Sequence, residues 1–304
     1  MSVDAVLIAG PTASGKSAAA LALAEQLRGA VINADSMQVY RELRTLTARP
    51  SKDDEARVPH RLYGHVPVRE RYSAGRYQDE ATRALAEIRG QRLLPIFVGG
   101  TGLYFAALTE GLSPIPAVPQ EVRDSVRLRF EEQGRDAFCA DLVQRDPASA
   151  AKLRPSDTQR LLRAADVLEA TGRSLSAWQE LSGKPGLAGL RLARFVTTPS
   201  RGVLAARIND RFETMAKGDG LKEASSLRGL DPSLPAARAL GLPQLWAHLD
   251  GECDLETAIE QAKLATRQYA KRQLTWFRNR MGDWKWLETD EISNLITGLM
   301  RELS

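Results

Sequence analysis

Four residues near the start of the chain, Gly10, Gly15, Lys16 and Ser17, match the pattern G-x-x-x-x-G-K-[ST] in full. Glycines in such a loop allow backbone N–H groups to converge on phosphate oxygens, and the following helix adds partial positive charge at its N-terminus. The lysine can neutralise phosphate oxygens, and the serine hydroxyl is suited to Mg²⁺. We therefore predict a phosphate-binding loop made of Gly10, Pro11, Thr12, Ala13, Ser14, Gly15, Lys16 and Ser17, with Mg²⁺ as cofactor on Ser17.

Asp35 and Thr101 are candidates for work on a second substrate. Asp35 ends the apolar run 31–34, and Thr101 follows the apolar run 94–98 within a Gly-Gly-Thr-Gly turn. Ligands of open parallel sheets bind beyond the carboxyl ends of the strands, so both side chains should face the phosphate-binding loop. Asp35 could hold Mg²⁺ or act as general base for an acceptor beside the phosphates, and the residue pattern leaves both roles open.

The phosphate-binding loop does not by itself identify the reaction. Nucleotide kinases, ATPases and GTPases all use such a loop, so phosphoryl transfer or hydrolysis is the default expectation. The residues at the other strand ends have to decide between these reactions and others.

Two regions are suited to a polyanion. Between Lys263 and Trp286 the chain has seven cations against one acid, with five aromatic residues interleaved. Such a run is either a solvated helix face or a nucleic-acid surface. The segment Gln159-Arg160-Leu161-Leu162-Arg163 places two cations three residues apart on one helix face. Together with Arg123, it suggests a domain that closes on a nucleic-acid backbone.

The elements that must position these residues follow an α/β order. Apolar runs at 3–9, 31–34 and 94–98 predict buried strands, and apolar residues at helical spacing predict helices over 16–28 and 75–89. This order predicts a P-loop NTPase-like parallel sheet flanked by helices on both faces.

After residue 111 the sequence pattern changes from alternating strands and helices to a proline-rich segment followed by helices, which predicts a helical insertion. The segment 113–119 contains three prolines, and 183–190 is rich in glycine, so both are candidate hinges. From 120 to 178 the pattern is helical, whereas 192–197 resumes as a strand. We assign residues 1–118 and 196–304 to a discontinuous core with C-terminal helices, and 119–195 to an all-helical insertion domain.

Composition narrows the class of protein. The 304 residues include only two cysteines, Cys139 and Cys253, which excludes a disulfide framework and fits a reducing cytoplasm. No apolar run is long enough to span a membrane. Because the loop begins at Gly10, we expect no targeting segment before it. We also expect a monomer without an obligate protein partner.

The motifs together resemble the bacterial tRNA dimethylallyltransferases (tRNA isopentenyltransferases). The resemblance runs from about Val6 to Arg278 in the same order, and so covers nearly the whole chain. The segments that carry it are GPTASGKS from Gly10, NADSMQVYR from Asn33, YSAGRYQ from Tyr72, PIFVGGTGLY from Pro95, DTQRLLRA from Asp157, RINDRFETM from Arg207, RALGLPQL from Arg238 and TRQYAKRQLTWFR from Thr266.

The resemblance implies a prenyl transfer to tRNA. That family moves the dimethylallyl group of dimethylallyl diphosphate to N6 of the adenosine on the 3′ side of the anticodon, releasing diphosphate. The loop would then hold a leaving group, with Lys16 stabilising its charge and Arg207 as a second cation. Asp35 would deprotonate the amine, and Thr101 would orient it.

The resemblance also implies a surface for the anticodon stem-loop. The target adenosine has to leave the stack, so a flipped base between the core and the insertion is expected. The implied tRNA contacts are Asp35, Ser36, Met37, Gln38, Thr101, Arg123, Gln159, Arg160, Leu161, Leu162 and Arg163.

Three other functions remain open on the sequence. The first is a nucleotide kinase, and the second is a non-catalytic RNA-binding regulator that uses the basic C-terminal region. The third is a prenyltransferase that acts on free adenosine nucleotides, against which Arg160 and Arg163 in the insertion argue.

Overall fold

The structure is a computed structural model and describes residues 3–303. Its centre is a six-stranded sheet of order β3-β2-β4-β1-β5-β6, in which each pair of neighbouring strands runs parallel. The strands are β1 (Ala5–Ala9), β2 (Gly29–Asn33), β3 (His60–Arg61), β4 (Leu94–Gly99), β5 (Leu192–Thr198) and β6 (Lys285–Glu288). The parallel sheet that the apolar runs predicted is therefore confirmed.

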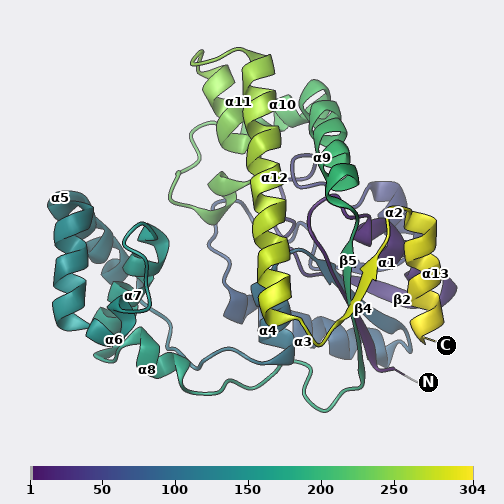
Figure 1. The fold of residues 1–304 in the computed structure, drawn as a ribbon, viewed down its shortest axis with the longest axis horizontal. Coiled ribbons are helices and arrows are strands. Elements are labelled where there is room, and N and C mark those ends of the chain that lie inside the picture. Colours follow the sequence, from purple (N-terminus) through teal and green to yellow (C-terminus); the bar gives the residue numbers. More distant parts are fainter. Residues whose placement is uncertain (1–2, 304) are drawn as a thin grey trace. The chain divides into compact units, whose positions relative to one another are not determined.

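Helices cover both faces of the sheet (Figure 1). They are α1 (Lys16–Gln26) and α13 (Ile292–Leu303) on one face, and α3 (Ala74–Gly90), α4 (Gly102–Thr109) and the end of α12 (Leu255–Arg280) on the other. Successive side chains of a strand point to opposite faces. Val6 and Ile8 of β1 accordingly pack in the cluster with α1 and α13, whereas Leu7 packs in the cluster that contains Phe277 of α12.

A second group of helices extends the core beyond the sheet. It contains α9 (Arg201–Met215), a π-helical turn (Ala216–Gly220), α10 (Leu221–Ser226), α11 (Leu242–Leu249) and the first half of α12. A short helix α2 (Lys52–Arg57) lies in the segment between β2 and β3. The apolar residues of α9 to α12 pack with Val39, Tyr40 and Leu43, so the chain that follows β2 is fixed against this group of helices.

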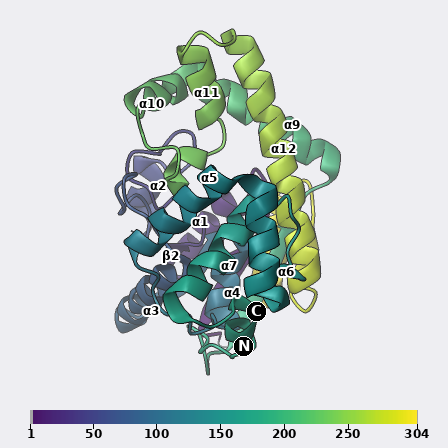
Figure 2. The same ribbon diagram turned by 90° about the vertical axis from the view of Figure 1, so that its left-hand side faces the viewer.

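Residues 110–185 form a separate compact unit of helices. It consists of α5 (Gln120–Arg145), α6 (Pro147–Ala150), α7 (Thr158–Thr171) and α8 (Leu175–Gln179), with α5 packed along α7 (Figure 2). Gly134 has a left-handed φ of 76° and kinks α5. A core of its own, with Phe138 and Leu161 buried, holds this unit together. The all-helical character predicted for the insertion is thus what the described residues show.

The predicted limits of the insertion, 119 and 195, need correction. The separate unit begins at 110 and ends at 185. Val118 is buried in the core of that unit, which is why the proline-rich segment belongs to the insertion. Residues 192–195 instead start β5, where Leu192 to Val196 pair with β1.

Strand β6 was not predicted, because the chain after residue 200 was read as entirely helical. It pairs in parallel with β5 from Phe195–Lys285 to Thr198–Glu288 and lies at the edge of the sheet. Its four residues, Lys-Trp-Leu-Glu, do not alternate between apolar and polar side chains, so they give little strand signal in the sequence.

Helices α5 and α12 are long enough for a membrane span, with 26 residues each. Both carry charged residues throughout their length. Across residues 3–303, no helix combines the length and the apolar character needed to cross a membrane.

The backbone of Ala34 joins the ends of β2 and β4. Its N–H donates to the carbonyl oxygen of Val98 at 2.8 Å, and its carbonyl oxygen accepts from the N–H of Thr101 at 3.2 Å. A Cβ on Gly99 would lie 2.0 Å from the Ala34 carbonyl oxygen, so only glycine allows this approach. The two bonds place Asp35 beside the turn that carries Thr101.

Replacing Gly99 with alanine should therefore destabilise the protein. Because the new methyl group meets backbone, relief requires a strand to move, and we expect a loss of about 3 kcal/mol in the free energy of unfolding. Gly90→Ala is the matched control, since nothing lies within 4 Å of its Cβ position at the end of α3. Helix propensity makes that change neutral or stabilising by up to about 1 kcal/mol. Urea unfolding followed by circular dichroism measures both, and equal effects would contradict the argument.

Candidate active site

The predicted phosphate-binding loop follows β1 directly and leads into α1. Ala13 and Gly15 have left-handed φ values of 64° and 87°, which turn the loop around the N-terminus of the helix. A Cβ on Gly10 would lie 2.3 Å from the Thr197 hydroxyl oxygen, so that position also requires glycine. The Thr197 hydroxyl donates to the Ser14 hydroxyl at 2.9 Å and ties the loop to β5.

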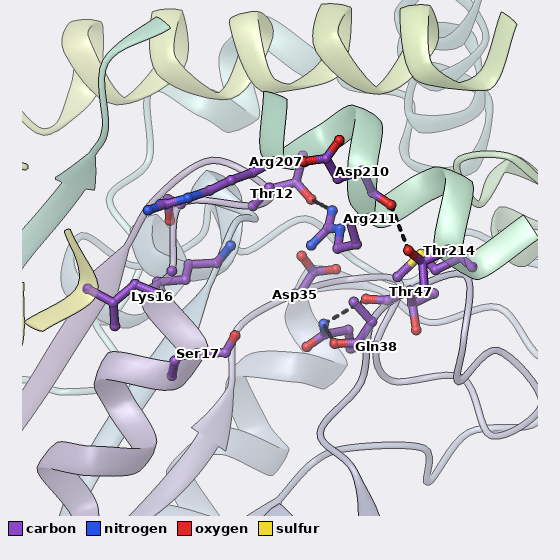
Figure 3. Close-up of a pocket in the computed structure, with 17 residues that line it drawn as sticks. Thr12, Lys16, Ser17, Asp35, Gln38, Thr47, Arg207, Asp210, Arg211 and Thr214 are labelled. Atoms are coloured by element: carbon purple, nitrogen blue, oxygen red, sulfur yellow. Dashed lines mark hydrogen bonds between the residues drawn. The ribbon is translucent and has the colours of Figure 1, made fainter. Parts of the chain in front are cut away.

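The loop forms one wall of a cavity of about 630 Å³ (Figure 3). Side chains at the end of β2, from the loop at Thr47, from α9 and from the first residue of α13 form the rest of the lining. All of them belong to the sheet-containing unit. The structure thus brings the predicted residues Thr12 to Ser17, Asp35, Gln38 and Arg207 to one cavity.

Lys16 lines this cavity and is partly buried. Its Nζ donates to the carbonyl oxygen of Pro11 at 3.0 Å. Burial lowers the pKa of Lys16 to about 8, an effect that the Asp35 carboxylate opposes and the Arg211 guanidinium reinforces. A partly buried ammonium group with one carbonyl partner is well placed to gain from an anion.

Two arginines on α9 add positive charge to the cavity. Arg207 and Arg211 are four residues apart and therefore share one face of the helix. Arg211 donates to the hydroxyl of Thr12, and burial lowers its pKa despite the nearby Asp35. Arg207 donates to the backbone carbonyl of Asp290, ahead of α13. Sequence reasoning selected Arg207 and missed Arg211, although the spacing within RINDR was available as a signal.

Asp35 is held by a local network at the end of β2. Its backbone N–H donates to Oδ1 of Asn33 at 2.8 Å, and its own Oδ1 accepts from the N–H of Met37 at 2.9 Å. Its other oxygen, Oδ2, lies 3.4 Å from the Cβ position of Gly100, which is itself 2.1 Å from Nε2 of Gln273. Figure 3 shows the Asp35 carboxylate close to Arg211. Asn33, which fixes this geometry, was not singled out in the sequence.

Thr101 contacts the residue that follows Asp35. Its hydroxyl oxygen accepts from the N–H of Ser36 at 2.9 Å and lies 3.2 Å from the Ser36 hydroxyl. Burial raises the pKa of the Tyr269 phenol on α12, and the nearby Asp35 carboxylate acts in the same direction. Asp35 and Thr101 therefore lie near each other at the ends of β2 and β4, although Asp35 lines the cavity of the phosphate-binding loop and Thr101 does not.

Gln38 has a structural task at the rim of the cavity. Its side-chain amide donates to the carbonyl oxygens of Thr47 and Ala48 at 2.8 and 3.0 Å. The same loop is held from the other side by Glu223, whose carboxylate accepts three backbone N–H bonds from Arg44, Thr45 and Leu46. These contacts fix the loop that lines the cavity.

The remaining predicted contacts lie on α5 and α7 of the separate helical unit. Arg123 and Arg163 lie close together, because each guanidinium acts on the same carboxylate, Asp166. Burial together with Arg123 lowers the pKa of Arg163, and burial raises that of Asp166. Arg160 is exposed, with a single ion pair to Asp157 at 3.3 Å.

Leu161 needs correction as a predicted tRNA contact. Its side chain is only 3 % exposed and packs in the core of the helical unit, with Leu162 packed partly against the same core. The two leucines therefore stabilise α7, whereas Arg160 and Arg163 remain the charged positions of the segment.

Part of the basic run between Lys263 and Trp286 is structural. Lys263 is buried and pairs with Glu260 and Glu213 at 2.8 and 3.2 Å, and Arg267 donates to Asn209. Phe277 and Trp284 belong to the core beneath the sheet. Most aromatic residues of this run thus serve packing, whereas the cations Lys271, Arg272, Arg278 and Arg280 are exposed on α12.

The oxygen atoms that the protein offers in the cavity suit Mg²⁺ only if a bound substrate and water supply most of the metal's ligands. Ser17 contributes a hydroxyl beside the loop, and Asp210 lines the same cavity. Within residues 3–303 there is no group of three His, Cys, Asp or Glu side chains that could hold a metal alone. Mg²⁺ commonly binds one or two protein oxygens together with substrate phosphates and water, and the residues present fit that mode.

The chain is similar to proteins of one family throughout its length. A family model described as IPP transferase matches residues 38–280, and one described as isopentenyl transferase matches residues 3–67. It is 53% identical over 290 residues to a tRNA dimethylallyltransferase of Nitrobacter hamburgensis, covering 95% of this chain and 92% of that protein. A tRNA dimethylallyltransferase of Bradyrhizobium sp. is 50% identical over 297 residues, with 97% and 96% covered.

Solved structures agree with the sequence comparison. The tRNA isopentenylpyrophosphate transferase of Bacillus halodurans has a TM-score of 0.67 at 34% identity, covering 98% of this chain and 96% of its own. A eukaryotic dimethylallyltransferase described as acting on tRNA has a TM-score of 0.80 at 27% identity, covering 98% and 77%. Chain length, motif order, fold and cavity all lead to one assignment, and the chain belongs to the IPP transferase family of tRNA dimethylallyltransferases.

Proposed function

We propose that this protein transfers the dimethylallyl group of dimethylallyl diphosphate to N6 of the adenosine on the 3′ side of the tRNA anticodon. The observation that carries this proposal is the composition of one cavity. An anion-binding loop and the cations Lys16, Arg207 and Arg211 line it together with a carboxylate, Asp35. The first group suits a diphosphate leaving group, and the second suits an amine that must lose a proton.

The cations of the cavity stabilise the diphosphate leaving group. As the bond between C1 of the prenyl group and the diphosphate oxygen breaks, its electron pair stays on the diphosphate. Lys16 and Arg211, both partly buried, stabilise this growing charge more than they stabilise the substrate. Mg²⁺ held by Ser17 and phosphate oxygens would supply further positive charge when bound.

The amine is activated by a proton acceptor, the carboxylate of Asp35. The lone pair of adenine N6 is delocalised into the ring, which makes it a poor nucleophile. When N6 attacks C1 of the prenyl group, the N–H proton passes to the carboxylate of Asp35. The Thr101 hydroxyl, fixed by the N–H of Ser36, orients the acceptor. The products are N6-isopentenyladenosine in the tRNA and free diphosphate.

The tRNA backbone is recognised in this proposal by the charged side chains of α5 and α7. Arg123, Arg160 and Arg163 supply positive charge for phosphates of the anticodon stem-loop, and Gln159 adds a polar group. The target base reaches Asp35 and Thr101 by leaving its stack, for which Ser36 to Gln38 form part of the rim.

Asp35→Asn should lower the rate of transfer at least about a hundredfold, because the amide cannot accept the proton of N6. Affinity for tRNA should stay within about threefold of the parent, because the side chains remain close in size. The assay follows labelled dimethylallyl diphosphate into unmodified tRNA, with AMP as an alternative acceptor. Asp53→Asn, an exposed position on α2, is the control. If the wild-type protein prenylated AMP but not tRNA, tRNA would not be the acceptor. If the Asp35→Asn variant kept the normal rate, Asp35 would not be the general base.

The pKa of Lys16 predicts a pH dependence of substrate capture. Since the pKa is lowered from 10.5 to about 8, the free protein loses this cation as the pH rises through about 8. The value of kcat/KM for dimethylallyl diphosphate should then fall up to tenfold per pH unit above that point. The bound diphosphate favours the charged lysine, so kcat at saturation should change less. A kcat/KM that stays constant to pH 10 would contradict this role.

Arg160→Ala should weaken tRNA binding and reduce the slope of log K against log salt by about 1, as expected for one lost phosphate contact. Filter binding across a range of salt concentrations measures this slope. Arg83→Ala, on the exposed side of α3, removes the same charge at a site without a proposed role. An equal loss in both variants would show that total charge, and no contact of Arg160, governs binding.

A further inference from the structure

Gln273 joins two loops of the active site through one side-chain amide. It lies on α12 and is only 5 % exposed. Its Oε1 accepts from the backbone N–H of Thr12 in the phosphate-binding loop at 2.9 Å. Its Nε2 donates to the carbonyl oxygen of Gly100 in the turn after β4 at 2.8 Å. The three segments are distant in sequence, and this group joins them.

The two loops serve different halves of the reaction. Thr12 belongs to the wall that faces the leaving group, and its hydroxyl accepts from Arg211. Gly100 precedes Thr101, and its Cβ position lies 3.4 Å from Oδ2 of Asp35 and 2.1 Å from Nε2 of Gln273. The amide therefore fills the space that a side chain at Gly100 would need, next to the carboxylate.

We propose that Gln273 is a positioning residue that sets the separation between the diphosphate and the acceptor amine. The inference rests on the proposed prenyl transfer, in which the two reacting atoms are held by different loops. A misplacement of about 1 Å between reacting groups can lower a rate a hundredfold without a change in binding. Gln273 fixes the relative position of the loops, although it touches neither substrate.

The polarity of the two partners explains why glutamine is suited to this position. A backbone N–H requires an acceptor, and a backbone carbonyl requires a donor. A carboxamide supplies both at a fixed distance, and so does a protonated carboxyl group, whereas an ionised carboxylate supplies acceptors only. This difference gives the inference a chemical test that is separate from packing.

The experiment compares Gln273→Glu with the wild-type protein from pH 6 to pH 9. Above the pKa of the introduced carboxyl group, its second oxygen faces the Gly100 carbonyl and repels it. Burial beside that carbonyl raises the pKa of the introduced group toward the lower end of this range. We expect kcat for tRNA prenylation to be reduced at least about tenfold at pH 9. The ratio of variant to wild-type kcat should rise as the pH falls.

Two further variants separate positioning from folding. Gln273→Met keeps the size of the side chain without its hydrogen bonds, so its kcat ratio should be low and independent of pH, with KM values within about threefold. Ala270 and Phe277 of α12 stay buried in this variant, so the helix should remain docked. Gln268→Glu introduces the same charge at an exposed position of α12 and should leave the rate unchanged. Thermal melting of each variant reports its folding.

A ratio for Gln273→Glu that is the same at every pH would overturn the inference, as would a wild-type kcat in Gln273→Met. Should Gln273→Glu fail to fold, the kcat and KM of Gln273→Met decide the question. Failure of the proposed function can be told apart from failure of this inference, because the wild-type protein itself would then transfer no prenyl group to tRNA.

Discussion

The site depends on the close approach of two strand ends through the backbone of Ala34. Its N–H is bound by Val98 and its carbonyl by Thr101, and Gly99 permits the contact by having no side chain. Since β1 lies beside β4 in the sheet, the same edge also presents the phosphate-binding loop. A parallel sheet thus brings a leaving-group site and an acceptor site together without any loop having to reach across the molecule.

Positive charge in the cavity carries a desolvation cost that the residues of the free protein offset only in part. Burial lowers the pKa of both Lys16 and Arg211, which means that the folded chain disfavours their charged forms. The Asp35 carboxylate compensates in part, since it acts on both groups in the opposite direction. In the proposed function, the diphosphate of the substrate supplies more negative charge at the same place, which favours its binding to the free site.

The sequence predicted the parts of the site that depend on local chemistry. Glycine spacing identified the loop, and the ends of apolar runs identified Asp35 and Thr101. Arg211 and Gln273 were not predicted, because their importance arises from the packing of α9 and α12 onto the phosphate-binding loop. For the same reason the basic run on α12 was ambiguous, since only the fold shows that Lys263 meets Glu213. The limits of the insertion were displaced because prolines mark a bend in the chain, whereas burial of Val118 decides which unit the bend joins.

A phosphate-binding loop serves two kinds of reaction that differ in the atom under attack. In phosphoryl transfer the nucleophile approaches phosphorus, so the cations must follow charge on the oxygens around the reacting centre. In alkyl transfer the nucleophile approaches carbon, and all of the developing charge leaves with the diphosphate. The second case needs cations at one end of the reacting line and a proton acceptor at the other. In the proposed function, Lys16 and Arg211 supply the cations and Asp35, which lines the same cavity, supplies the proton acceptor. The separation of these groups, which Gln273 spans, then becomes the dimension on which the chemistry depends.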